Sequence, residues 1–152
     1  MLKNLTNKLK TKKAKECLEK CDIKSINYLT MEGFNCYAKC ISCYDGDTVQ
    51  VVAPFRDTKR LFKFKCRLLG INTPELRTKD LEEKKKGYEA RDFLRNKILD
   101  KIIWVEFSKP DKYGRDLCQL FDDEDKKINF NQLMIDEGLA MSYDGKGKKN
   151  WK

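Results

Sequence analysis

The chain has 152 residues, 38% of which are charged, and a net charge of +9. This length suits one domain with a core of ordinary size, and the basic excess indicates an acidic partner such as nucleic acid or an anionic membrane surface. The chain contains no histidine. The commonest general base of enzymes is therefore excluded, and any hydrolysis has to use carboxylates, arginines and a metal.

The first segment, residues 1–24, predicts a lysine-rich amphipathic helix with eight lysines against three acidic residues. Leu2, Leu5 and Leu9 share one face of this helix. Two interpretations stay open: a solvated helix docked on the domain by its leucines, or a basic arm that binds nucleic acid or an anionic surface. In either case, residues 1–33 are expected to form an N-terminal extension.

No segment near the start has the continuous apolar run of a secretory signal, and none is long enough to span a bilayer. We therefore expect an intracellular protein, cytoplasmic or nuclear or packaged in a particle, with reduced thiols. Its cysteines are seven in number. A zinc site would need paired Cys-x-x-Cys spacings or a histidine to complete it, so the pattern favours cysteines as small core or surface residues.

From Phe34 onward the pattern changes to strands, which we expect over 34–44, 48–53 and 61–69. A turn at Asp45-Gly46-Asp47 joins the first two, with the glycine supplying flexibility. The third strand alternates. One face carries Phe62, Phe64, Cys66 and Leu68, and the polar face carries Lys63, Lys65 and Arg67.

The rest of the chain predicts a charged mobile loop followed by helices and strands, in the order loop 76–86, helix 88–99, strand 102–107, strand 115–121 and helix 129–137. A basic tail follows over 144–152. Five short strands with an interposed helix predict an α+β fold that is mainly β. We expect a five-stranded OB-fold barrel over 34–143, with two packed helices and the extra N-terminal helix.

Three short motifs carry the chemistry, and each alone is an ordinary turn. They are Asp45-Gly46-Asp47-Thr48, then Arg67 followed by Thr73-Pro74-Glu75, and finally Asp111-Lys112-Tyr113-Gly114-Arg115. Carboxylate oxygens suit a hard divalent cation, and arginine guanidinium groups match phosphate with two hydrogen bonds. Together the motifs supply what is needed to hold a cation and a phosphodiester.

Two further short motifs accompany these three, Gly87-Tyr88-Glu89-Ala90 and Glu137-Gly138-Leu139-Ala140. Taken together in chain order, the motifs resemble those of the staphylococcal nuclease (thermonuclease-like) family. The resemblance runs from about Phe34 to Tyr143. It implies an OB-fold barrel and a calcium-dependent nuclease that acts on DNA and RNA, with other divalent metals as alternatives. Single strands are the expected substrate, because unpaired bases can stack on exposed tyrosines. A monomer is expected.

The resemblance also implies roles for individual residues. Glu75 would position or deprotonate the attacking water, and Arg67 and Arg115 would grip the phosphate. The metal ligands would be Asp47, Asn72 and Thr73, the last through its backbone carbonyl. The nucleotide would be flanked by Lys112, Tyr113 and Tyr143, and Asp45 and Thr48 would support the metal turn.

This sequence departs from the family pattern in three ways. Asn72 replaces the second metal carboxylate, so the site loses one formal charge. The insert between Asp47 and Arg67 is longer than in secreted members and carries Arg56, Lys59 and Arg60. Secreted members continue into a further C-terminal helix, and we expect the leading helix to cover the surface that this helix would protect.

These departures leave alternative functions open beside the nuclease. The second interpretation, after the nuclease, is a nucleic-acid-binding module that has kept the barrel and the basic surface but lost effective turnover. A third and weaker interpretation is a packaging component that holds an acidic polymer with its basic arm.

Overall fold

The computed structural model describes residues 2–26 and 28–146, with the side chains of the first helix described from Lys10 onward. Its elements are α1 (Leu2–Lys20), a short 3₁₀ helix (Ile23–Ser25), β1 (Asn35–Cys43), β2 (Thr48–Pro54), β3 (Leu61–Leu68), β4 (Ile71–Asn72), α2 (Leu81–Ile98), β5 (Ile102–Pro110), β6 (Asp116–Phe121), α3 (Phe130–Asp136) and β7 (Met141–Ser142).

Five strands close into a barrel in the order β1-β2-β3-β6-β5, in which only the β3–β6 pair is parallel. The predicted α+β fold with a five-stranded OB-type barrel is confirmed. The two-residue strands β4 and β7 pair with each other in a separate small sheet. They were not expected, since two residues are too short to show any periodicity.

The barrel core follows from the alternation of apolar residues along the strands. Inward positions such as Val49, Val51, Val105 and Leu120 are completely buried, while their neighbours are at least partly exposed or lie at strand ends. The core also contains five free thiols, those of Cys36, Cys40, Cys43, Cys66 and Cys118. Burial raises the pKa of Cys36 to about 11, so this side chain packs as a neutral thiol.

Helix α2 begins at Leu81, and the prediction of a mobile loop over 76–86 is wrong from that residue onward. Asp80 caps the helix, because its Oδ1 accepts hydrogen bonds from the N–H groups of Glu82 and Glu83 at 2.9 and 3.2 Å. The buried face of α2 starts only at Gly87. The charged first turns of α2 therefore show no helical spacing of apolar residues. The capping residue Asp80 was the feature of the sequence that could have predicted where the helix begins.

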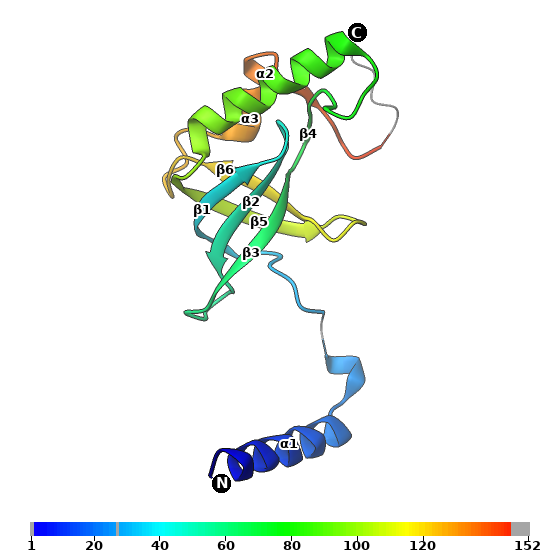
Figure 1. Ribbon diagram of the computed structural model, residues 1–152, viewed down its shortest axis with the longest axis vertical. Coiled ribbons are helices and arrows are strands. Elements are labelled where there is room, and N and C mark those ends of the chain that lie inside the picture. Colours follow the sequence, from blue (N-terminus) through cyan, green and yellow to red (C-terminus); the bar gives the residue numbers. More distant parts are fainter. Residues whose placement is uncertain (1, 27, 147–152) are drawn as a thin grey trace.

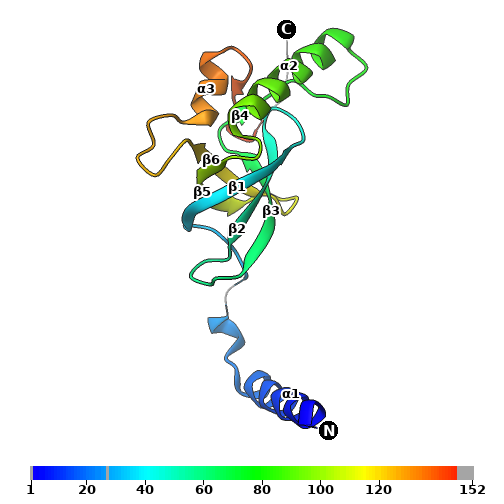
Figure 2. The same cartoon turned by 60° about the vertical axis from the view of Figure 1, so that its left-hand side comes forward.

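Helices α2 and α3 lie at one end of the barrel together with β4, and α1 lies beyond the opposite end (Figures 1 and 2). Residues 10–20 of α1 are all exposed, including Leu18 at 73%. The structure therefore does not support the expectation that this helix covers part of the barrel. Leu2, Leu5 and Leu9, proposed as its docking face, lie outside the residues whose side chains are described, as does most of the basic tail.

No helix in the described part of the chain combines the length and the apolar composition needed to cross a bilayer. The β1–β2 turn, which holds the first predicted motif, and the segment around β4, which holds the second, lie at the end of the barrel that carries α2 (Figure 1). The β5–β6 hairpin, which holds the third motif, lies at the side of the barrel.

Candidate active site

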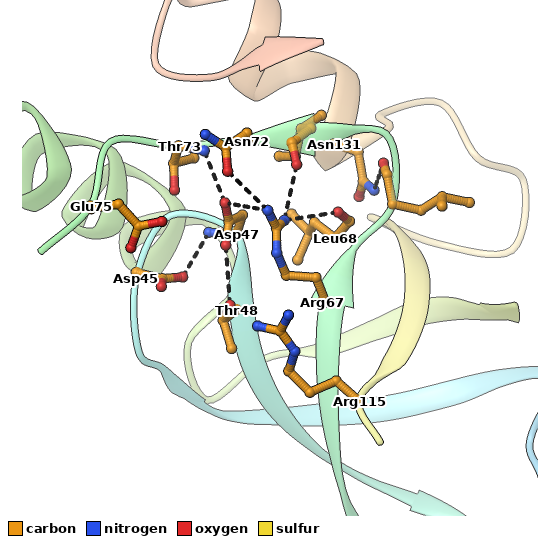
Figure 3. Close-up of polar contacts among 12 residues, drawn as sticks. Asp45, Asp47, Thr48, Arg67, Leu68, Asn72, Thr73, Glu75, Arg115 and Asn131 are labelled. Atoms are coloured by element: carbon orange, nitrogen blue, oxygen red, sulfur yellow. Dashed lines mark hydrogen bonds and ion pairs between the residues drawn. The ribbon is translucent and has the colours of Figure 1, made fainter. Parts of the chain in front are cut away.

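The carboxylate of Asp47 is buried and held by three partners. Its Oδ2 accepts a hydrogen bond from the backbone N–H of Thr73 at 2.9 Å and lies 3.0 Å from Nη2 of Arg67. Its Oδ1 accepts from the hydroxyl of Thr48 at 3.1 Å (Figure 3). The first two predicted motifs, far apart in the sequence, therefore meet at this carboxylate.

Gly46 is needed for a different reason from the one expected. Its backbone does not have the positive φ that favours glycine. A Cβ added at this position would instead lie 2.8 Å from Cγ2 of Thr73 and 2.9 Å from Cβ of Ala90. The glycine thus allows the β1–β2 turn to approach both the Thr73 segment and α2.

Arg67 is only 8% exposed, although it ends the polar stripe of β3. Its Nη1 donates to the carbonyl oxygens of Leu68 and Ile71 at 3.1 and 3.0 Å, and its Nη2 donates to Oδ1 of Asn72 at 3.2 Å. The guanidinium is therefore fixed between the carboxylate of Asp47 and the start of β4, as Figure 3 shows.

Arg67 and Arg115 line one open cleft of about 560 Å³. The predicted nucleotide-flanking residues lie there as well, so the cleft brings together Arg67, Lys112, Tyr113, Arg115 and Tyr143. Tyr113 is 72% exposed, with the Lys112 ammonium 5.0 Å and the Arg115 guanidinium 5.6 Å from its ring centre. The cleft therefore combines cations with an accessible aromatic face, as nucleotide-binding surfaces do.

Asp111 orients Arg115, a role that the sequence did not indicate although the residue belongs to the third motif. Its Oδ2 accepts from Nε of Arg115 at 2.7 Å, and its Oδ1 accepts from the backbone N–H groups of Arg115 and Tyr113. Burial opposes ionisation of this carboxyl, but the hydrogen bonds from Arg115 and Tyr113 outweigh it and lower the pKa of Asp111. The carboxylate is charged and keeps the hairpin and its arginine in one arrangement.

Glu75 lies outside the cleft, on the side of Arg67 that carries the carboxylates. It is exposed, and its backbone N–H donates to Oε1 of Glu83 at 3.2 Å. Figure 3 shows its side chain directed toward Asp45 and Asp47. The site thus has an acidic part and a basic part, and Arg67 contacts the first while lining the second.

Asn131 is a buried residue that sequence reasoning missed. Its Nδ2 donates to the carbonyl oxygens of Leu69 and Cys118 at 3.0 Å, and its Oδ1 accepts from the N–H of Leu120 at 3.1 Å. It thereby ties α3 and β6 to the turn that follows Arg67. Its position next to Phe130, on the inner face of a predicted helix, could have indicated a buried polar residue.

Residues 65–152 match a family model described as staphylococcal nuclease homologue, which covers more than half of the chain. The chain belongs to this family. The resemblance seen in the ordered motifs is therefore confirmed.

This staphylococcal nuclease homologue is similar to several curated proteins. It is 32% identical over 130 residues to the uncharacterized protein MJ1439 of Methanocaldococcus jannaschii, covering 70% of this chain and 59% of that protein. It is 26% identical over 108 residues to an uncharacterized endonuclease of Escherichia coli O157:H7, covering 71% and 61%. It is 31% identical over 104 residues to the thermonuclease of Staphylococcus hyicus, covering 67% and 56%. The chain thus spans less than two thirds of the length of these relatives.

Asp45 and Asp47 are the carboxylates of the site that a divalent cation could contact. Asp45 is partly buried, and burial followed by the charge of Asp47 raises the pKa of Asp45 to about 6. A cation would offset this repulsion between neighbouring carboxylates. Within the described residues no three His, Cys, Asp or Glu side chains form a metal cluster. The remaining ligands would therefore have to be neutral oxygens, such as the Asn72 amide and the Thr73 carbonyl.

Asn72 is the predicted metal ligand of this staphylococcal nuclease homologue whose surroundings suit a cation least. The residue is completely buried, its Oδ1 is used by Arg67, and its Nδ2 has no hydrogen-bond partner among the described residues. An amide offers a cation one neutral oxygen, and unlike a carboxylate it also carries an N–H donor. We therefore expect the residues to hold a divalent cation with reduced affinity.

Gly87 offers a first test of how tightly this end of the fold is packed. A Cβ there would lie 2.9 Å from the carbonyl oxygen of Pro74 and 2.9 Å from Cδ2 of Leu76. Alanine normally stabilises a helix by about 1 kcal/mol relative to glycine. Here we expect Gly87→Ala to destabilise the protein by about 1–3 kcal/mol, because backbone next to Glu75 has to move.

The measurement is a comparison of melting temperatures with Lys85→Ala, at an exposed position of the same helix. We expect a lower melting temperature for Gly87→Ala and little change for Lys85→Ala. A rise for Gly87→Ala would show that helix propensity dominates and that the close approach to Pro74 is unimportant.

Proposed function

We propose that this protein is a divalent-metal-dependent nuclease, using calcium, that hydrolyses phosphodiester bonds in single-stranded DNA or RNA. The observation that carries the proposal is the arrangement of Arg67. It contacts the buried carboxylate of Asp47 on one side and lines a cleft shared with Arg115, Lys112 and Tyr113 on the other. The similarity to a thermonuclease and to an uncharacterized endonuclease supports the same reaction class.

The residues divide the work of in-line hydrolysis between them. Arg115, oriented by Asp111, offers a fixed guanidinium to the phosphate, and a preorganised charge of this kind stabilises the transition state. Arg67 fixes Asp47 and adds positive charge at the cleft wall. Glu75 orients the attacking water and accepts its proton, a role that histidine cannot take in this chain.

Asp45, Asp47, Asn72 and Thr73 would hold the cation. When bound, it supplies Lewis-acid stabilisation of the phosphoryl oxygen and a template for the substrate. Tyr113 and Tyr143 at the cleft would contact the bases of an unpaired strand, since stacking on an aromatic ring does not depend on base identity.

A second candidate function is a nucleic-acid-binding module with little or no turnover. The unpartnered Nδ2 of Asn72 favours it, because the position that normally carries a metal carboxylate here presents a donor. The basic cleft would then remain useful for binding alone.

A cleavage assay combined with a binding assay separates the two functions. Purified protein is incubated with end-labelled single-stranded DNA and RNA in calcium, in other divalent metals and in chelator. Binding is followed by fluorescence anisotropy over a range of salt concentrations. The nuclease predicts metal-dependent fragments. Salt-sensitive binding without cleavage in any metal would decide for the module.

Asn72→Asp tests the ligand assignment. We expect the new carboxylate to tighten calcium binding by about tenfold or more, because it adds a formal charge and removes the unpartnered donor. Calorimetric titration of calcium measures the effect, with Asn96→Asp at an exposed position of α2 as the matched control. Equal calcium affinity of the wild type and Asn72→Asp would contradict the assignment of Asn72 as a metal ligand.

A further inference from the structure

The outward face of β3 carries exposed lysines that the site does not use. Lys63 and Lys65 are exposed, whereas Cys66 between Lys65 and Arg67 is completely buried. Because side chains alternate along a strand, Lys63, Lys65 and Arg67 point to the same face. A line of positive charge therefore leads along β3 to the arginine at the site.

The strand register extends this basic surface sideways. On β2, Val52 pairs with Lys63, Gln50 with Lys65 and Thr48 with Arg67. On β1, Lys39 pairs with Val52, so that exposed Lys39 lies on the same row as Lys63. None of these paired residues is acidic. The surface formed by Lys39, Lys63 and Lys65 is called the β3 track below.

The insert noted in the sequence forms the hairpin between β2 and β3 at the far end of this track. Arg56 has a structural role there, since its Nε donates to the carbonyl oxygen of Thr30 at 2.8 Å and its Nη2 to that of Glu32 at 3.3 Å. Lys59 and Arg60 remain exposed beside Asp57, and the Arg60 guanidinium lies 5.5 Å from the ring centre of Phe62. The hairpin therefore continues the basic surface away from the site.

The β3 track and Arg67 together span more than one nucleotide of a strand. β3 runs from the hairpin near the α1 end of the barrel to the end that carries α2 and the site (Figure 1). Lys63 and Arg67 are four residue steps apart along the strand, which corresponds to about 13 Å. OB folds bind about 4–16 nucleotides of single strand along such surfaces.

We propose that the β3 track binds backbone phosphates of a single-stranded polynucleotide several nucleotides away from the bond at the site. The inference rests on the proposed function and deepens it. Phosphate is the shared chemistry of DNA and RNA, and the exposed lysines complement it. A single strand is the fitting form, because it can bend from the outer face of β3 into the cleft beside buried Arg67, whereas a duplex is stiff on this scale.

The test compares the affinity of long and short single strands for the variant Lys63→Gln/Lys65→Gln. Binding of a 20-nucleotide and a 3-nucleotide DNA, and of a 20-nucleotide RNA, is measured by anisotropy in a Glu75→Gln background so that the probes survive. The matched control is Lys85→Gln/Lys86→Gln, two exposed lysines on α2. Melting temperatures verify that both double variants fold.

For the variant of the track we expect affinity for both 20-nucleotide strands to fall about three- to tenfold. The slope of log affinity against log salt should decrease in magnitude by about 1.4, the value for two lost phosphate contacts on a single strand. Affinity for the 3-nucleotide DNA should stay within about twofold, and the control should match the parent protein.

The proposal is overturned if the variant binds the 20-nucleotide strands like the parent, if the short strand loses as much as the long one, or if the control loses as much as the variant. If affinity falls only for the 20-nucleotide DNA or only for the 20-nucleotide RNA, the track recognises the sugar and not the phosphate. That result also contradicts the proposal. The outcome is separable from the nuclease reaction. If the wild-type protein cleaves no strand but the track variant still loses long-strand affinity, the track stands without the nuclease. If the wild-type protein cleaves and the track variant keeps its long-strand affinity, only the nuclease stands.

Discussion

Glu75→Gln is expected to lower the rate of single-strand cleavage by about 10²–10⁴. Glutamine keeps the size of the side chain but cannot accept the proton of the attacking water. Figure 3 places the Glu75 carboxylate facing Asp45 and Asp47, where the chain offers no histidine as a substitute base. Single-turnover cleavage of a labelled oligonucleotide at saturating calcium measures the chemical step without product release.

Glu82→Gln provides the control, because Glu82 is an exposed residue in the first turn of the nearby helix α2. It removes the same charge and should leave the rate within about twofold. Strand affinity of Glu75→Gln should stay close to that of the wild type. If cleavage by Glu75→Gln remained within tenfold of the wild type, Glu75 could not be the proton acceptor.

Arg115→Ala is expected to reduce the same rate by about 10²–10³, equivalent to about 2.7–4 kcal/mol of transition-state stabilisation. The guanidinium is fixed by Asp111 at 2.7 Å and lines the cleft, so its charge needs no reorganisation when the phosphate becomes more negative. Arg115→Lys should recover only part of the rate, because lysine cannot pair with Asp111 and phosphate through a planar fork.

Arg91→Ala is the matched control, since Arg91 forms an ion pair on α2 with Asp92 outside the cleft. Comparison of kcat and KM distinguishes catalysis from binding. A transition-state role predicts a fall in kcat larger than the rise in KM. A change confined to KM would assign Arg115 to substrate binding alone.

Much of the fold was predictable because its signals are local. The alternation of Lys63, Lys65 and Arg67 with apolar residues identified β3, and the turns at Asp45-Gly46-Asp47 and at Asp111–Arg115 separated the strands. The missed elements lack such signals. The first turns of α2 are charged throughout, and β4 and β7 have two residues each.

The candidate site was predictable as a set of residues but not as a geometry. Sequence order identified Asp47, Arg67 and Arg115, but it could not show that Arg67 is buried and shared among four acceptors. The roles of Asp111 and Asn131 as supports depend on contacts between separate elements, which have no sequence pattern. The steric requirement for Gly46 also depends on contacts between separate elements, since it arises from the side chains of Ala90 and Thr73. The catalytic and metal-binding roles themselves remain predictions.

The most direct test of metal-dependent hydrolysis at this site is the cleavage rate of a labelled 20-nucleotide single strand by the wild-type protein as calcium is increased. We predict a rate that rises with calcium, saturates at a higher concentration than that of Asn72→Asp, and disappears in chelator. A strand that stays intact at every calcium concentration while bound to the protein would contradict the account, as would cleavage that continues unchanged in chelator.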